Sequence, residues 1–233
     1  MPRDAPVLAR PYGVLRTLLL VFGVASIVHA FYVSMVAAMS IGIDVGPDGA
    51  TMPWAVVPER FRELYRHGST IDLIFVALLC GSAITWLRWQ TLAEDDAATS
   101  GAPSDRTGAG IWWWFIPVAN LWKPYQLVRS LAVRSERLND RGASTGPVVA
   151  WWILWLGGVA AFVVARVWTT GVAELSDPIS SRDLVAAALV ADVLLGAAAL
   201  TAVLVTGRIT AALEWARLHP TRQRPGVQPV PDR

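Results

Sequence analysis

LVAAALVADVLLGAAALTAVLVT, residues 184–206, is an apolar run that contains a single charged residue. A helix needs about 20 apolar residues to cross the roughly 30 Å hydrocarbon core of a bilayer, so this run is long enough to span a membrane. Three further apolar runs lie at residues 17–43, 71–87 and 148–165, the second of them at the lower length limit. The sequence therefore predicts an all-α integral membrane protein, a four-helix bundle with four spans.

The overall composition agrees with a membrane protein that has short polar ends. Hydrophobic residues make up 54% of the chain and charged residues 16%, whereas soluble domains typically carry about 25% charged residues. We expect a cytoplasmic segment at residues 1–16, a membrane domain at 17–210 and a cytoplasmic, largely disordered tail at 211–233. Residues 93–110 have no apolar periodicity, which predicts a flexible linker between the second and third spans.

The basic residues outside the spans indicate which side of the membrane each loop occupies. With four spans, both termini lie on the same side. That side carries 15 of the 20 Lys and Arg residues, and the other side carries five. The positive-inside rule assigns the richer side to the cytoplasm. We therefore expect both termini to be cytoplasmic.

IWWWFIPVANLWKPYQLVRSLAVRSERL, residues 111–138, is the most distinctive part of the chain. Placed on a helix, its residues separate into an apolar face and a polar, cationic face. The apolar face contains Val118, Leu121, Tyr125, Val128 and Ala132. The polar face contains Lys123, Gln126, Ser130, Arg134 and Arg137. This pattern is typical of a helix lying in the headgroup plane, and we predict such an interfacial helix at about residues 117–138.

Two prolines interrupt this element. Pro124 has no N–H and leaves the carbonyl of Asn120 without its helical partner, while Pro117 can open a first turn. The Asn120 side chain can cap a new helix start or form a local hydrogen bond. The pattern favours an entry at F-I-P-V-A-N that dips into the interface, followed by an amphipathic helix that starts at K-P-Y-Q-L-V-R. A re-entrant loop, whose freed backbone groups would need cover, and a straight fifth span remain as alternatives.

The motif W-F-I-P-V-A-N-L-W-K-P-Y-Q, residues 114–126, followed by a basic amphipathic helix and two more spans, resembles domain of unknown function family 4328. The similarity covers roughly residues 14–210. The residues of this interfacial element are Phe115, Pro117, Asn120, Leu121, Trp122, Pro124, Tyr125 and Gln126. The resemblance implies the four-span layout and a place in the cell (inner) membrane of a bacterium. It implies no reaction, because the family has no assigned biochemistry.

An acid and an imidazole lie near the middle of predicted spans. A carboxylate near a span centre, such as that of Asp192, costs about 2.5–3.5 kcal/mol, so we expect it to face the bundle. His29 lies midway along the first span. Three interpretations remain open for the pair: a buried hydrogen bond between two helices, a site for proton or cation transfer, and no contact. One acid and one imidazole fall short of the ligand set of a metal site, so we expect no metal.

Basic residues next to the Trp-rich element are candidate contacts to anionic lipid headgroups. They are Lys123, Arg129, Arg134, Arg137 and Arg141. Ordinary positive-inside topology explains the same residues equally well. We expect the lipid bilayer to be a partner, with other membrane proteins or further copies of this chain as additional candidates, and we expect no nucleic acid.

The sequence contains no Gly-rich phosphate loop, zinc-protease motif, C-x-x-C pair or G-x-S-x-G elbow,. We therefore expect a non-enzymatic protein with no catalytic residues and no cofactor. The first hypothesis is a scaffold or accessory subunit that binds other membrane proteins or anionic lipid. The alternative is a small transporter or channel that uses Asp192 and His29. Four helices enclose only a thin pathway, so this alternative requires oligomerisation.

Overall fold

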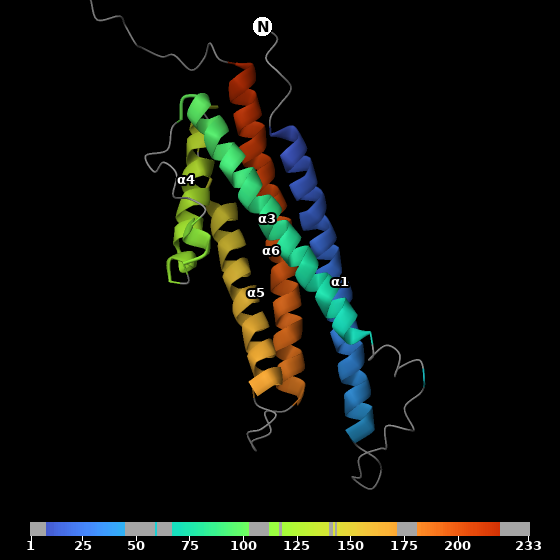
Figure 1. Cartoon of the computed structure of the whole chain (residues 1–233). Helices are drawn as coiled ribbons and strands as arrows, with labels where there is room; N and C mark the ends of the chain where they lie inside the picture. The colour runs from blue at the N-terminus through green and yellow to red at the C-terminus, as the bar shows by residue number, and fades with distance from the viewer. Residues whose placement is uncertain are drawn as a thin grey trace, which may run out of the picture. The chain divides into compact units, whose positions relative to one another are not determined.

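The computed structural model describes residues 8–44, 59, 67–102, 112–116, 118–139, 142, 144–171 and 181–219. Every regular element in these ranges is helical (Figure 1). The α-helices are α1 (Ala9–Asp44), α3 (Gly68–Thr99), α4 (Lys123–Arg137), α5 (Gly146–Gly171) and α6 (Ser181–Leu218), and the 3-10 helices are η2 (Trp112–Trp114) and η3 (Ala119–Leu121). The predicted all-α fold class is confirmed, including an amphipathic helix, α4, between the second and third spans.

Four of these helices are long and apolar enough to cross a membrane. The candidate spans are Ala9–Met35, Thr70–Thr99, Gly146–Ala165 and Val185–Leu218, with 27, 30, 20 and 34 residues. At about 1.5 Å per residue, even the shortest is about 30 Å long, which matches the hydrocarbon core. The four predicted spans are confirmed, and each belongs to a helix longer than its apolar run.

Helices α3 and α6 continue beyond the ends that the sequence suggested. The predicted flexible linker was wrong for residues 93–99, which belong to α3. The reason is that Ala93 and Ala97 are buried one turn apart, so the helix keeps an inward face after its apolar run ends,. Gly101, with φ 91°, then ends α3 in a conformation that glycine adopts at low cost,. Likewise, α6 continues past the predicted boundary at 210 to Leu218.

The chain divides into two compact units. Unit 1 comprises Met1–Arg16, Ile84–Val149 and Ala202–Arg233, and unit 2 comprises Thr17–Ala83 and Ala150–Thr201. Each of the four long helices contributes one segment to each unit. The candidate site lies in unit 2, and the Trp-rich element lies in unit 1.

Small residues bring the helices of unit 2 together. A Cβ atom added to Gly158 of α5 would lie 2.8 Å from Cγ of Leu195 on α6, so only glycine fits at this contact. On the other side of α6, a Cβ atom at Gly196 would lie 3.3 Å from Cβ of Ser26 on α1. Membrane helices use small residues for such close approach. Helix α6 therefore packs against both α5 and α1.

Candidate functional site

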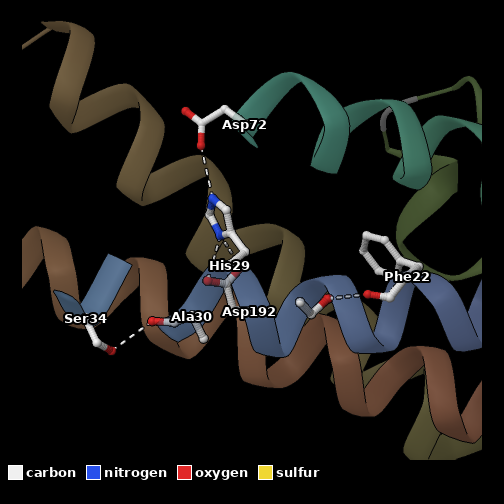
Figure 2. A network of polar contacts seen from close by, with 7 residues as sticks. Phe22, His29, Ala30, Ser34, Asp72 and Asp192 are labelled. Atoms are coloured by element: carbon white, nitrogen blue, oxygen red, sulfur yellow. Dashed lines mark hydrogen bonds and ion pairs between the residues drawn. The ribbon is translucent and has the colours of Figure 1, made fainter. Parts of the chain in front are cut away.

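His29 of α1 lies between two carboxylates that come from two other helices of unit 2. Its Nδ1 atom is 2.8 Å from Oδ2 and 3.0 Å from Oδ1 of Asp192 on α6. Its Nε2 atom is 3.0 Å from Oδ1 of Asp72 on α3. Figure 2 shows the imidazole with one carboxylate at each of its two nitrogens. We call Asp72, His29 and Asp192 the triad.

The three side chains of the triad differ in exposure. The side chain of Asp192 is 2% exposed and that of His29 is 9% exposed, whereas that of Asp72 is 32% exposed. A charged group as buried as Asp192 is stable only when it is paired. The triad therefore runs from a half-exposed carboxylate through an imidazole to a buried carboxylate.

The two hydrogen bonds of His29 constrain where protons reside. A neutral imidazole has one N–H donor, and an ionised carboxylate only accepts hydrogen bonds. Both imidazole–carboxylate bonds therefore form only when the ring carries a proton on each nitrogen, or when one carboxyl group carries a proton. In either state the triad holds one proton more than a neutral ring with two carboxylates. That proton has three adjacent positions, linked by contacts of 2.8 to 3.0 Å.

Aromatic side chains close one side of the triad. The ring of His29 stacks on Phe75, with centroids 4.7 Å apart and planes 22° from parallel. The ring of Phe75 in turn packs against that of Phe22, with ring centroids 5.1 Å apart, and both phenylalanines are buried. The nearby Ser26 hydroxyl donates to the carbonyl oxygen of Phe22 at 3.0 Å, within its own helix. Ser26 is therefore engaged with its own backbone and does not extend the triad.

The sequence singled out two members of the triad, and the structure brings them together. The third member, Asp72, was missed because it follows the start of a predicted span, where an acidic residue is ordinary. The sequence nevertheless contained an indication that Asp72 has a role within the span, since it is the only charged residue of the run 71–87. Within the described ranges, no group of three or more His, Cys, Asp and Glu side chains is placed to hold a metal ion.

The Trp-rich element folds in two parts within unit 1. Two short 3-10 helices come first, and α4 then begins at Lys123, as the K-P-Y-Q-L-V-R pattern predicted. Pro124 lies in the first turn, where a helix needs no N–H partner,. The helix starts at Lys123 and not at residue 117 because the backbone breaks at Trp122, with φ −141°. Of the two roles open to Asn120, the cap is not formed, because Trp122 holds the N-cap position of α4 and no side-chain cap hydrogen bond is present there.

The apolar face of α4 is occupied by protein. Val128 and Ala132 are buried, in agreement with the predicted face, whereas Val118 and Leu121 are exposed. The prediction failed for these two because it treated residues 117–138 as one helix. Among the motif residues, Phe115, Trp122 and Gln126 are exposed, Asn120 and Tyr125 are half-buried, Pro124 is buried and Pro117 lies outside the described residues.

Two of the candidate headgroup residues contact other parts of unit 1. Arg134 donates to Oε2 of Glu94 at 2.5 Å and to the carbonyl oxygen of Ala102 at 2.8 Å. The Nζ atom of Lys123 lies 5.3 Å from the ring centroid of Trp113, a cation–π distance,. The remaining candidates are Arg129 and Arg137, both exposed, and Arg141, which lies outside the described residues.

Ion pairs join three helices of unit 1 in a closed ring. One pair links α3 to α4, a second links α3 to α6, and a third links α4 to α6. The pairs are Glu94–Arg134, Asp96–Arg217 and Glu136–Arg208. Asp96 and Glu136 are both buried. Because buried carboxylates need partners, this ring fixes α4 to segments of two span-forming helices.

Four membrane-length helices, three of which contribute to a polar triad, define a multi-pass helical membrane protein. Residues 58–211 match a family model described as Domain of unknown function (DUF4328), which covers more than half of the chain. The chain therefore belongs to this family, and the family resemblance predicted from the motif is confirmed. No curated protein and no solved structure matches the chain.

Proposed function

We propose that this protein is a non-enzymatic transporter that moves protons across the membrane, with the triad as its proton-binding site. One observation carries the proposal: a buried imidazole in one span bonds to carboxylates from two others. Ionisable groups inside spans are costly and commonly mark ion or proton pathways. A single hydrogen bond is enough to join two helices, whereas a second carboxylate adds the cost of another charged group.

The exposure of the triad gives the proposed path a direction. A proton enters at half-exposed Asp72, passes through His29 and reaches buried Asp192. Imidazole suits this step because it accepts a proton on one nitrogen and releases one from the other. Asp72 follows the loop predicted to face outward, so we propose entry from the outer face of the cell (inner) membrane, with both termini in the cytoplasm.

The phenylalanine pair supports a mechanism with moving helices. Phe75 and Phe22 are buried beside His29, so apolar rings border this side of the triad. A bound proton then crosses only when the helices repack around the site, as in alternating access. A further proton neutralises one carboxylate and weakens its attraction to the ring. Proton binding thereby shifts the balance between two helix packings.

We further propose that the transporter works in the lipid bilayer as a homo-oligomer or with other membrane proteins, and without nucleic acid. A single chain with four spans encloses little volume. Its span segments in unit 2 expose large apolar side chains, which include Ile27, Phe31, Leu73, Ile153 and Val193. These side chains are suited to contact lipid tails and neighbouring spans.

The test is proton flux in vesicles that contain the purified protein and a trapped pH-sensitive dye. After an acid jump outside, the wild-type protein should acidify the interior faster than empty vesicles do. Asp192→Asn, Asp72→Asn and His29→Gln should each abolish this difference while the helix content stays constant. The matched control is Asp95→Asn, which removes an exposed acid from the same helix as Asp72. Wild-type flux in folded Asp192→Asn protein would refute the proposal.

A scaffold or accessory subunit is the second candidate function. The observation in its favour is that Arg129 and Arg137 remain exposed on α4, where an acidic partner or anionic lipid has access to them. In this case Asp192→Asn should lower stability and leave flux at the level of empty vesicles throughout. A stoichiometric protein partner in native membrane patches, purified without detergent, would then support the scaffold.

A further inference from the structure

Six large apolar side chains are exposed in unit 1 immediately before α4. They are Trp112, Phe115, Ile116, Val118, Leu121 and Trp122, each between 43% and 69% exposed. The same segment is also attached to the protein, because Ala119 is buried and Trp114 packs edge-on against Trp86 of α3 at 6.5 Å. We call residues 112–116 and 118–122 the anchor segment. One side of this segment packs on the rest of unit 1, and its other side exposes aromatic and aliphatic side chains.

Helix α4 does not share this property. Its apolar side chains Val128 and Leu131 are fully buried, and its outward side carries Gln126, Ser130 and Arg137. The ion pair between Arg134 and α3 holds it in this orientation. The apolar surface that remains uncovered in this region therefore belongs to the anchor segment.

We propose that the anchor segment inserts into the interfacial layer of an anionic lipid bilayer. The segment lies between two candidate spans, Thr70–Thr99 and Gly146–Ala165, so the chain tethers it to the membrane at both ends. Trp and Phe rings favour the headgroup level, where an apolar body meets a polar surface. Contiguous exposed apolar side chains on a soluble surface would be unfavourable, whereas the bilayer interface accommodates them.

The basic residues around the anchor segment favour a bilayer surface that carries negative charge. Between residues 112 and 139 the sequence contains one acidic residue, Glu136, and it is paired with Arg208. Arg129 and Arg137 are exposed, and Lys123 lies at the end of the anchor segment. Each basic residue near an anionic surface contributes about 1 kcal/mol to the attraction. The region around the anchor segment therefore offers the exposed positive charges of Arg129 and Arg137 to the headgroups.

The test uses spin labels on the full chain. Cys80 is the only cysteine, so Cys80→Ser gives a background into which single cysteines are introduced. Phe115→Cys and Val118→Cys place labels on the anchor segment, and Gln126→Cys and Ser130→Cys place matched controls on the exposed side of α4. In vesicles of phosphatidylcholine and phosphatidylglycerol, collisions with oxygen report hydrocarbon depth, and collisions with a water-soluble nickel chelate report water.

We expect oxygen collisions to exceed nickel collisions several-fold at positions 115 and 118, and the reverse at 126 and 130. Labels at 115 and 118 that behave like the controls would overturn the proposal, because the segment would lie in water. Labels shielded from both reagents would also overturn it and would indicate cover by protein.

A second variant tests the charge selectivity. Arg129→Gln combined with Arg137→Gln should move the labels at 115 and 118 toward water in vesicles with phosphatidylglycerol. The same variant should leave them unchanged in phosphatidylcholine alone. An equal response in both lipids would overturn the assignment of an anionic surface.

Discussion

Replacing Arg217 with Met should strongly destabilise unit 1. Asp96 is 3% exposed, and Arg217 is its ion-pair partner through Nε. Apart from Arg217, the described residues offer neither carboxylate oxygen of Asp96 a hydrogen-bond donor. Arg217→Met keeps most of the side-chain length and removes the guanidinium. It therefore leaves a buried carboxylate without its partner.

The expected magnitude follows from this burial. Removing one partner of a buried ion pair costs about 3–5 kcal/mol, because the remaining charge loses compensation. Arg217 is partly exposed, so water can reach the vacated position, and we expect about 3 kcal/mol, the lower end,. That loss raises the unfolded fraction at equilibrium by roughly a hundredfold. Asp96→Leu combined with Arg217→Met removes both charges and should restore most of the stability, since apolar replacements of buried pairs are often neutral.

The assay is equilibrium unfolding of the purified protein in lipid bicelles, with the free energy of unfolding compared across variants. Arg129→Met is the control, because it removes an exposed arginine and should change stability by less than about 0.5 kcal/mol. The reasoning is refuted if Arg217→Met costs no more than this control. It is also refuted if the double variant is as unstable as Arg217→Met alone.

Three further contacts give separate predictions. Gly158→Ala should force α5 away from α6 and lower the free energy of unfolding by about 1–3 kcal/mol,. The control Gly81→Ala adds a Cβ with nothing within 4 Å and should leave stability in thermal unfolding unchanged or raise it. Equal effects of the two variants would contradict the assigned contact. Trp89→Phe removes a hydrogen bond of 3.1 Å to α6 and should cost at least about 1 kcal/mol by denaturant titration,. Arg134→Gln should lower Tm by breaking the contact with α3, while exposed Arg137→Gln should leave Tm unchanged; a reversed order would show that Arg134 is free in solution.

The spans could be predicted because a bilayer imposes a length and an apolar composition that any sequence must satisfy. The start of α4 could also be predicted, because Pro124 is acceptable in a first turn and disruptive further along. The cost of a carboxylate inside a span indicated only that Asp192 should face the bundle, and whether it meets His29 stayed open in the sequence. These features depend on local chemistry and on the membrane alone.

The remaining features depend on which helices become neighbours. Asp72 joins the triad only because α3 packs beside α1, and nothing in its local sequence shows that contact. The last turns of α3 were missed because the half-polar sequence Ala93–Thr99 has the composition of a linker. Only the structure shows that its alanines Ala93 and Ala97 are buried. The apolar face of α4 was predicted at Val128 and Ala132, but its cover by protein was not, because the ion pairs of Arg134 and Glu136 that attach α4 to α3 and α6 join residues far apart in the sequence.

The measurement that tests the triad most directly is nitrogen NMR of the His29 ring. The protein has three histidines, so His67→Gln and His219→Gln leave His29 as the sole signal. The account predicts that Asp192→Asn shifts the Nδ1 resonance, that Asp72→Asn shifts the Nε2 resonance, and that both resonances respond together to pH in the parent protein. A ring nitrogen that is insensitive to the carboxylate it faces, or a ring that does not respond to pH, would contradict a shared proton.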